Sequence, residues 1–395
     1  MDLTPEIAVA AVLEAGGVDK GARALGVPRD AFRTFCATHG VSKIGLRQPA
    51  PIVQNDAVLE QEIRQLRSQV KSLTEGEHTA ERVIRRLERA IDVVRPQYRV
   101  SPSLPPSSSR TPQEMVLLFS DMHASEVVSL EETRGINEYN WEIMLNRMAG
   151  ISHGIRSHTE HFGFDISKLN IYLLGDSISG DIHDELAITN DRPSAEAIVQ
   201  LAVDTVEWLL DLADDFPVIH LAGVPGNHPR KSKAPAAKQA HNNGDWLYYK
   251  LVEAYLQGHP NFTFDFPRGS FNVQMICDRY RALLMHGDGI RSSMPGVPWA
   301  GISRRVTTLE QQFSKNREPL DYVFLGHFHT SNSLDGIQAR TWINGSVKGA
   351  DEYSLKAFGS GRDASQTLLT FHPRRGHTGS YPLDLQGSQA ASEGW

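Results

Sequence analysis

The sequence has little cysteine, no long apolar run and no excess of positive charge. Cys36 and Cys277 are its only cysteines in 395 residues, so we expect no disulfide framework and a cytoplasmic location. No apolar stretch reaches the ~18 residues of a membrane span, and the N-terminus lacks the basic start of a secretory signal. The net charge of -7 argues against a uniformly basic surface for nucleic acid, although a local basic patch remains compatible with it.

Composition divides the chain into five segments. Residues 1–48 are expected to form short helices broken by glycine, and residues 54–95 are rich in Glu, Gln, Arg and Leu without proline. Residues 96–112 form a Pro/Ser linker that cannot continue a helix. In residues 113–385 apolar strands alternate with helical stretches, as in α/β or α+β domains. We expect residues 386–395 to be a flexible tail.

The first segment has the spacing of a helix-turn-helix. Ala22 is small where two helices would cross, Gly26 permits the turn, and Pro28 suits the start of the next helix. A small helical protein-binding module is the alternative to DNA binding. The predicted DNA contacts lie on the second helix and are Arg29, Arg33 and Thr34.

Residues 59–94 keep a seven-residue apolar repeat with one clear break, at Glu77 beside Gly76. β-branched residues occupy one core position and mainly leucine the other, which favours a parallel two-stranded coiled coil. We therefore expect a homodimer, which suits a helix-turn-helix that binds paired half-sites. The alternatives are a long amphipathic helix lying on the C-terminal domain and a hairpin folded at Gly76.

In the fourth segment, polar clusters recur where predicted strands end. Each offers one or two oxygen or nitrogen ligands, and strand ends are where α/β folds place their chemistry. One such cluster is usually a turn, but five in series indicate a metal site. The clusters occur in the stretches "SDMHAS", "GDSISG", "GNHPR", "MHGDG" and "GHFHT".

These five clusters resemble the D-x-H, GD, GNH, single-histidine and GHxH motifs of the calcineurin-like metallophosphoesterases. The resemblance covers about residues 115–350, including the stretch "WINGSVKG", and extends to calcineurin-like proteins of tailed phages. It implies an α+β fold, a two-sheet β-sandwich flanked by helices, preceded here by a small all-α helix-turn-helix domain and a coiled-coil helix. A bacterial or phage-infected host is then expected.

The resemblance also implies two divalent metal ions. One would be bound by Asp121, His123, Asp176 and His329. The other would be bound by Asp176, Asn227, His286 and His327, so that the Asp176 carboxylate bridges the pair. Oxygen and imidazole ligands without thiolate suit Mn²⁺, which we expect, as well as Fe or Zn²⁺.

Two such ions about 4 Å apart provide a bridging hydroxide and neutralise the phosphoryl oxygens during in-line attack. His228 follows a ligand and is the candidate catalytic residue, as general acid or as a donor to the phosphoryl group. The chain departs from the family because Pro229 follows His228 where an acidic residue is usual, and because no early carboxylate follows Asp176. Candidates for the missing carboxylate are Asp181, Asp184 and Asp245.

We therefore expect a metal-dependent phosphoesterase, and the leading hypothesis is a phosphodiesterase or nuclease that acts on DNA. The motifs indicate phosphate-ester hydrolysis, and only the attached helical module indicates a nucleic acid. One alternative is a phosphoprotein or small-molecule phosphatase. The other is a non-catalytic DNA-binding regulator with a structural metal domain, against which the complete ligand set argues.

Overall fold

The computed structural model describes residues 4, 7–8, 10–12, 18–38, 112–163, 165–182, 189–231, 242–290, 296–352, 354–355 and 361–386. The predicted coiled coil, the linker before Pro112, the tail beyond Gln386 and the candidate Asp184 lie outside these ranges. Among the helices that these residues form, none combines the length and the hydropathy of a membrane span.

Two short helices form near the N-terminus, α2 (Val18–Leu25) and α3 (Arg29–Thr38). Gly26 turns the chain between them with a φ of 67°, a conformation that glycine adopts without steric cost. Ala22 and Phe32 are buried in a small core of their own. Two short helices joined at a glycine are therefore present, while the helix-turn-helix assignment and its binding to DNA stay predictions.

The first sheet has six strands in the order β11-β10-β1-β2-β3-β4. Strands β1 to β4 run parallel to one another, β10 pairs antiparallel with β1, and β11 pairs antiparallel with β10. The strands are β1 (Gln113–Phe119), β2 (Ile166–Leu173), β3 (Ile219–Gly223), β4 (Phe262–Asp265), β10 (Ser365–His372) and β11 (Gly376–Asp384).

The second sheet has five strands in the order β5-β6-β7-β9-β8. Its central strands β6, β7 and β9 run parallel, with an antiparallel strand on each side. The strands are β5 (Phe271–Ile276), β6 (Tyr280–Met285), β7 (Tyr322–Leu325), β8 (Asn332–Asp335) and β9 (Arg340–Ile343).

Strand β1 shows how the layers form. Its continuous apolar run is buried on both faces, as expected for a strand inside a layered domain. Met115 and Leu117 face a core shared with helices, whereas Val116 and Leu118 face a core shared with the second sheet. Because successive side chains of a strand point to opposite faces, the side chains of β1 pack alternately into the two cores.

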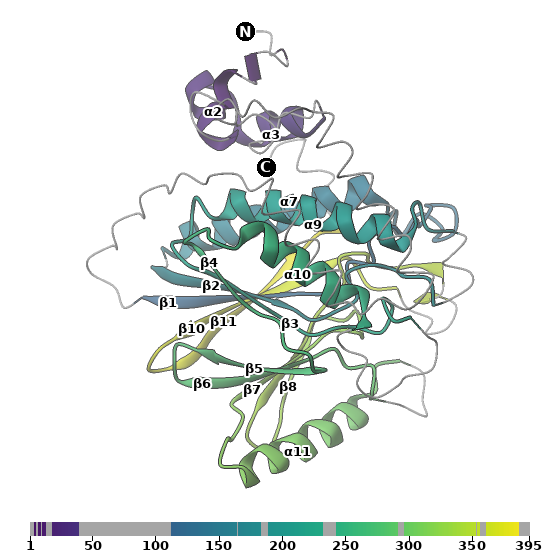
Figure 1. The fold of residues 1–395 in the computed structure, drawn as a ribbon, viewed down its shortest axis with the longest axis vertical. Helices are drawn as coiled ribbons and strands as arrows, with labels where there is room; N and C mark the ends of the chain where they lie inside the picture. Colours follow the sequence, from purple (N-terminus) through teal and green to yellow (C-terminus); the bar gives the residue numbers. More distant parts are fainter. Residues whose placement is uncertain are drawn as a thin grey trace.

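The helices cover the outer faces of the two sheets (Figure 1). Helices α7 (Trp141–Phe162), α9 (Ser194–Leu212) and α10 (Gly244–Leu256) pack on the first sheet, and α11 (Trp299–Lys315) packs on the second. Aromatic side chains such as Tyr172, Phe324 and Trp342 fill the space between the sheets, and the burial of a phenylalanine such as Phe324 contributes about 1.5–3 kcal/mol. The structure confirms the expected sandwich of two sheets flanked by helices.

Candidate metal centre

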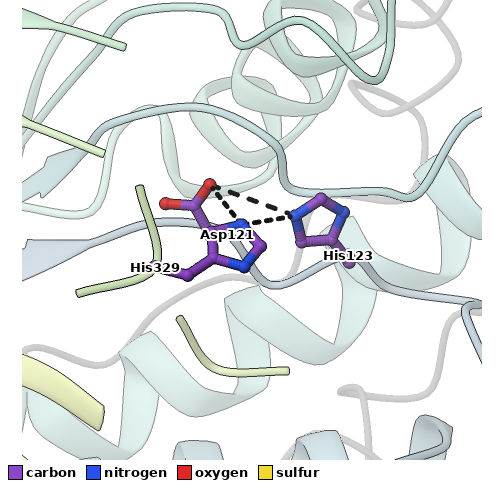
Figure 2. A group of neighbouring side chains, drawn as sticks. All are labelled: Asp121, His123 and His329. Atoms are coloured by element: carbon purple, nitrogen blue, oxygen red, sulfur yellow. Dashed lines mark hydrogen bonds and ion pairs between the residues drawn. The ribbon is translucent and has the colours of Figure 1, made fainter. Parts of the chain in front are cut away.

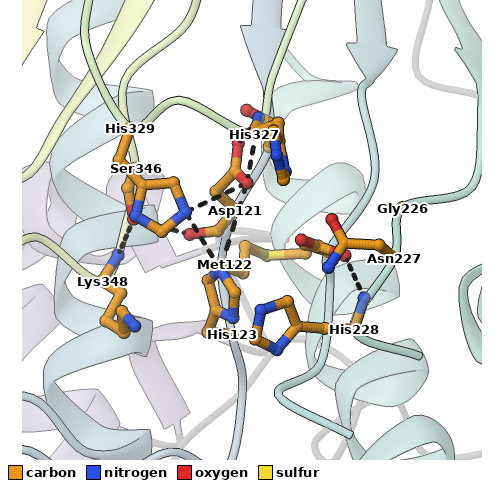
Figure 3. A network of polar contacts seen from close by, with 12 residues as sticks. Asp121, Met122, His123, Gly226, Asn227, His228, His327, His329, Ser346 and Lys348 are labelled. Atoms are coloured by element: carbon orange, nitrogen blue, oxygen red, sulfur yellow. Dashed lines mark hydrogen bonds and ion pairs between the residues drawn. The ribbon is translucent and has the colours of Figure 1, made fainter. Parts of the chain in front are cut away.

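The parallel strands of both sheets end at one edge of the sandwich, and the predicted ligands lie in the turns that come after these strands. Strands β1, β2 and β3 end before the first three motifs, and β6 and β7 end before the last two. Figure 3 shows most of these side chains converging on one place. All seven predicted ligands lie there: Asp121, His123, Asp176, Asn227, His286, His327 and His329.

Asp121, His123 and His329 form the first group (Figure 2). The Nε2 atoms of the two histidines lie 3.2 Å apart, and His329 Nε2 lies 3.2 Å from Asp121 Oδ1. His123 Nε2 lies 4.0 Å from the same oxygen. Two imidazole nitrogens and a carboxylate oxygen that face one point form a donor set suited to a divalent transition metal.

Asp176, His286 and His327 form the second group. His286 Nε2 lies 3.0 Å from both Asp176 Oδ2 and Asn227 Oδ1. The Asp176 carboxylate also lies within 4.8 Å of ligand atoms of His123, so it lies between the two groups. This is the position that a bridging carboxylate would require.

Two members of the second group, Asp176 and His286, shift each other's pKa values toward the charged forms. Burial alone would raise the pKa of Asp176, but His286 and His228 hold it well below the usual value. Burial lowers the pKa of His286, yet Asp176 raises it to about 10. A divalent cation bound here would take the place of the His286 proton, because a ligating imidazole is neutral.

His123 and His327 are held in the neutral form that binds metal. Burial and the nearby Lys348 lower the pKa of His123 well below its usual value. Burial and His286 lower the pKa of His327 to about 4. Asp121 adds an anion: burial raises its pKa, but His329 outweighs this and lowers it. The donor set therefore fits a divalent cation in its geometry and, apart from the His286 proton that the cation would replace, in its protonation.

Five of the predicted ligands have left-handed backbone conformations, which cost about 1–3 kcal/mol each for residues other than glycine. Such strain persists only where the surroundings fix it and is found mainly at functional sites. The values of φ are 54° at Asp121, 48° at His123, 55° at Asp176, 71° at His327 and 49° at His329.

Two glycines of the motifs are required by close packing. A Cβ atom at Gly226 would overlap the carboxylate and backbone nitrogen of Asp176. Gly175 has a φ of 94°, and a Cβ there would lie 2.8 Å from His286 Nδ1. The glycines therefore let the turns after β2 and β3 and the side chain of His286 approach one another.

The turns that present the ligands are fixed from outside the ligand set. Asp245, at the start of α10, accepts hydrogen bonds from the backbone N–H groups of Asp176 (2.9 Å), Ser177 (2.9 Å) and Gly226 (2.7 Å). After β9, the Ser346 hydroxyl donates to the Asp121 carbonyl at 2.9 Å. Asp245 thus positions two ligand turns.

His228 lies beside the ligands and is oriented by a backbone atom. Its backbone N–H donates to Asp176 Oδ1 at 2.7 Å, and its ring packs edge-on against that of His123. Its Nδ1 lies 3.0 Å from the carbonyl oxygen of Ser179. The carbonyl of Ser179 therefore contacts Nδ1, and Asp184, one of the three candidate carboxylates, lies outside the described residues. Among those candidates, Asp245 is occupied by backbone amides instead.

Two buried residues near the ligands were not identified from the sequence. Glu126 and Lys348 form an ion pair of 2.9 Å, and both are almost completely buried. They are separated by more than two hundred residues, and neither belongs to a periodic pattern. Only the position of Glu126 three residues after His123 and of Lys348 in the stretch "WINGSVKG" could have directed attention to them.

The predicted DNA contacts on α3 have partners within the protein. Arg29 and Arg33 both form ion pairs with Asp19, and Arg33 Nη2 also lies 3.1 Å from Asp211 Oδ2 on α9. The Thr34 hydroxyl donates to the carbonyl of Asp30 at 3.0 Å. DNA would have to compete with these carboxylates for the two arginines.

No family model matches the chain, and no curated protein matches it. Solved structures similar to it include Vps29 with Zn from Entamoeba histolytica, at 13% identity, TM-score 0.27 and coverage of 69% of this chain and 99% of that one. A predicted phosphoesterase from Streptococcus pneumoniae is 8% identical, with a TM-score of 0.26 and coverage of 70% of this chain and 99% of that one. An archaeal phosphodiesterase is 11% identical, with a TM-score of 0.30 and coverage of 68% of this chain and 99% of that one.

TM-scores below 0.5 do not decide a family. The motifs, the paired sheets and the seven side chains at their shared edge are stronger observations. The chain is similar to the calcineurin-like metallophosphoesterases. The similarity concerns the sandwich and its edge, and the N-terminal helix pair lies outside it.

Proposed function

We propose that the chain is a dinuclear-metal phosphoesterase, with phosphodiester bonds of DNA as its substrate. The observation that supports it is the pair of ligand groups at one edge of the sandwich, with Asp176 in the second group and within 4.8 Å of a ligand atom of His123 in the first. Mn²⁺ is the proposed metal, with Fe or Zn²⁺ also suited to the donors. When bound, two such ions supply an activated water and neutralise charge on the phosphoryl group.

The residues of the chain have distinct roles in this proposal. Asp121, His123 and His329 would hold one ion, and Asp176 would hold both. The second ion would be completed by Asn227, His286 and His327. His228 is half-buried beside Asp176, and its Nε2 would transfer a proton to the leaving oxygen or donate to the phosphoryl group.

The proposal of DNA as substrate rests on the helix pair α2–α3, which is joined by a turn at Gly26 and which we propose to be a helix-turn-helix. We also propose that residues 59–94 pair two chains as a coiled coil, which would place two such helix pairs in one molecule. A phosphatase that uses the same ions for a protein or a small molecule is the competing outcome.

The test is hydrolysis by the purified full-length chain after loading with Mn²⁺. Supercoiled, linear and single-stranded DNA are compared with bis(4-nitrophenyl) phosphate and a phosphomonoester. We expect cleavage of the diester and of at least one DNA form, abolished by chelation and by the Asp176→Asn substitution. Hydrolysis of the monoester alone would favour the phosphatase, and metal binding without any hydrolysis would reject the enzyme.

A further inference from the structure

Glu126 is a buried carboxylate outside the ligand set, only 6% exposed. Its two oxygens have different partners. Oε1 accepts a hydrogen bond from Lys348 Nζ at 2.9 Å, and Oε2 accepts one from the Ser179 hydroxyl at 2.9 Å. A buried anion is costly unless it is paired, and Lys348 provides that pairing. This leaves Oε2 directed toward the metal centre.

The first histidine near Oε2 is His123. Its Nε2 faces Asp121 and His329, so a metal ion would bind that atom and the ring proton would be on Nδ1. Nδ1 is buried without a hydrogen-bond partner among the described residues. Glu126 Oε2 lies 3.8 Å away, about 1 Å beyond the 2.7–2.9 Å expected for a charge-assisted hydrogen bond. A small rotation would form it.

The second histidine is His228, which Glu126 reaches through Ser179. The Ser179 carbonyl lies 3.0 Å from His228 Nδ1, and the Ser179 hydroxyl is bound to Glu126 Oε2. Ser179 is the third residue after Asp176, in the motif that lacks its early carboxylate. Glu126 therefore fixes Ser179, which in turn orients His228, although Glu126 is distant in sequence from Ser179 and from His228.

We propose that Glu126 is a positioning residue for two histidines, accepting the Nδ1–H of metal-bound His123 and anchoring Ser179 against His228. The inference rests on the proposed function, since it assigns a role within the same site. Carboxylates that accept from the second nitrogen of a ligating histidine fix its tautomer and orientation, and their loss typically lowers metal affinity 10–100-fold.

Lys348 would keep a carboxylate partner in a variant that lacks the Glu126 carboxylate, because it pairs with two carboxylates. Burial lowers the pKa of Lys348, but Glu126 and Asp351 together raise it above its usual value. Asp351 also pairs directly with Lys348. Replacing Glu126 by glutamine would therefore leave the lysine with a carboxylate partner, and the effect on the histidines can be measured in a folded protein.

The first experiment measures metal affinity by titration calorimetry of the metal-free full-length chain with Mn²⁺. Glu126→Gln should weaken the binding of one ion ~10–100-fold. Glu310→Gln is the matched control, because Glu310 is a buried glutamate on α11 that accepts from the backbone N–H groups of Gln338 and Ala339. The control should keep the affinity of the wild type.

The second experiment separates the two histidines with Ser179→Ala, which keeps the carbonyl and removes the hydroxyl bound to Glu126. Metal affinity should be unchanged. The kcat on diesters with poor leaving groups should fall more than on aryl diesters with good ones, because His228 would protonate the leaving oxygen. Glu126→Gln should show both defects, and Glu126→Asp should restore part of each.

The outcomes distinguish the inference from the proposed function. If the wild type binds two ions and hydrolyses diesters while Glu126→Gln matches it in affinity and in leaving-group dependence, the inference is wrong and the proposed function stands. If Glu310→Gln loses as much affinity as Glu126→Gln, the effect is one of general destabilisation and the inference is also wrong. A wild type that binds no ion overturns both.

Discussion

The backbone N–H of Asp176 donates a 2.9 Å hydrogen bond to the carboxylate of Asp245. The same carboxylate accepts from Ser177 and Gly226, so it joins the turn after β2 to the turn after β3. Burial, together with the charge of Asp176, raises the pKa of Asp245 to about 6. The turns after β2 and β3 are therefore held together by a residue outside the predicted ligand set.

Asp245→Asn should weaken metal binding ~10–100-fold, since an amide has one acceptor oxygen in place of two. At least one buried N–H would lose its partner, at a cost of about 1–3 kcal/mol in stability. Calorimetric metal titration and thermal unfolding measure the two effects. Asp204→Asn is the control, because Asp204 binds Trp141 on the outer helices. Equal metal affinity in both variants would contradict the positioning role.

Asp176→Asn should abolish diester hydrolysis and remove metal, because one carboxylate would serve both ions. Its oxygens contact His286 at 3.0 Å and the N–H of His228 at 2.7 Å, so the replacement alters both sides of the site. Metal content by elemental analysis and initial rates should fall together. An active variant that retains two ions would exclude the shared role.

His228→Ala should separate chemistry from metal binding. Both ions should remain, since Nδ1 of His228 is bound to a carbonyl and the residue is not assigned as a ligand. Turnover should fall ~10²-fold or more if His228 is an acid catalyst. Diesters with good leaving groups should be less affected. A loss that is the same for every leaving group would indicate stabilisation of the phosphoryl charge instead.

Deleting residues 1–112 should leave a fragment that folds, binds metal and cleaves a small phosphodiester at a near-normal rate. Every predicted ligand lies beyond this point. The fragment should be monomeric and should bind DNA weakly, with a shallower salt dependence, because Arg and Lys contacts to phosphates are lost. Light scattering and salt titration measure these properties. A dimeric fragment with unchanged DNA affinity would favour the phosphatase.

The N-terminal helix pair should loosen in acid. Burial alone would raise the pKa of Asp19, but Arg29 and Arg33 lower it from 3.8 to about 2. Because the folded value is the lower one, the stabilisation is present above the unfolded pKa and is lost as pH falls through about 2.

Asp19→Asn should therefore destabilise the pair at pH 7 by about 1 kcal/mol, given the partial exposure of its partners. At pH 2 the variant and the wild type should differ little. Amide hydrogen exchange of residues 18–38 measures the difference. A destabilisation that stays the same at both pH values would show that the charge of Asp19 is not its cause.

The convergence of the candidate ligands could be predicted because each follows a buried strand within a short local motif. His327 and His329 come just after strand β7 and Gly326, so the local sequence is enough to place them at the end of a strand. Asp245 is different, since its partners are backbone amides 19 and 69 residues away. A backbone acceptor such as the carbonyl of Ser179, which lies 3.0 Å from His228 Nδ1, has no sequence signature, so this contact of His228 could not be predicted.

The sheet order was only partly predictable for the same reason. The parallel neighbours β1, β2 and β3 follow from alternating strands and helices. The pairing of β10 with β1 joins Met115 to Thr370, and no local pattern specifies an antiparallel partner so far along the chain. Long-range pairing is decided by packing between the sheets, which becomes visible only in three dimensions.

At five of the predicted ligands the left-handed backbone lowers the stability of the fold, while the side chain is the one that would bind metal. Glycine, or asparagine with a smaller benefit, would relieve the strain at a residue such as His329, whose φ is 49°. A selection for thermal stability alone should therefore accumulate such substitutions at the ligand turns and yield tighter folds that bind no metal. Sequences under no selection for metal binding should therefore lose these histidines while keeping the two-sheet sandwich.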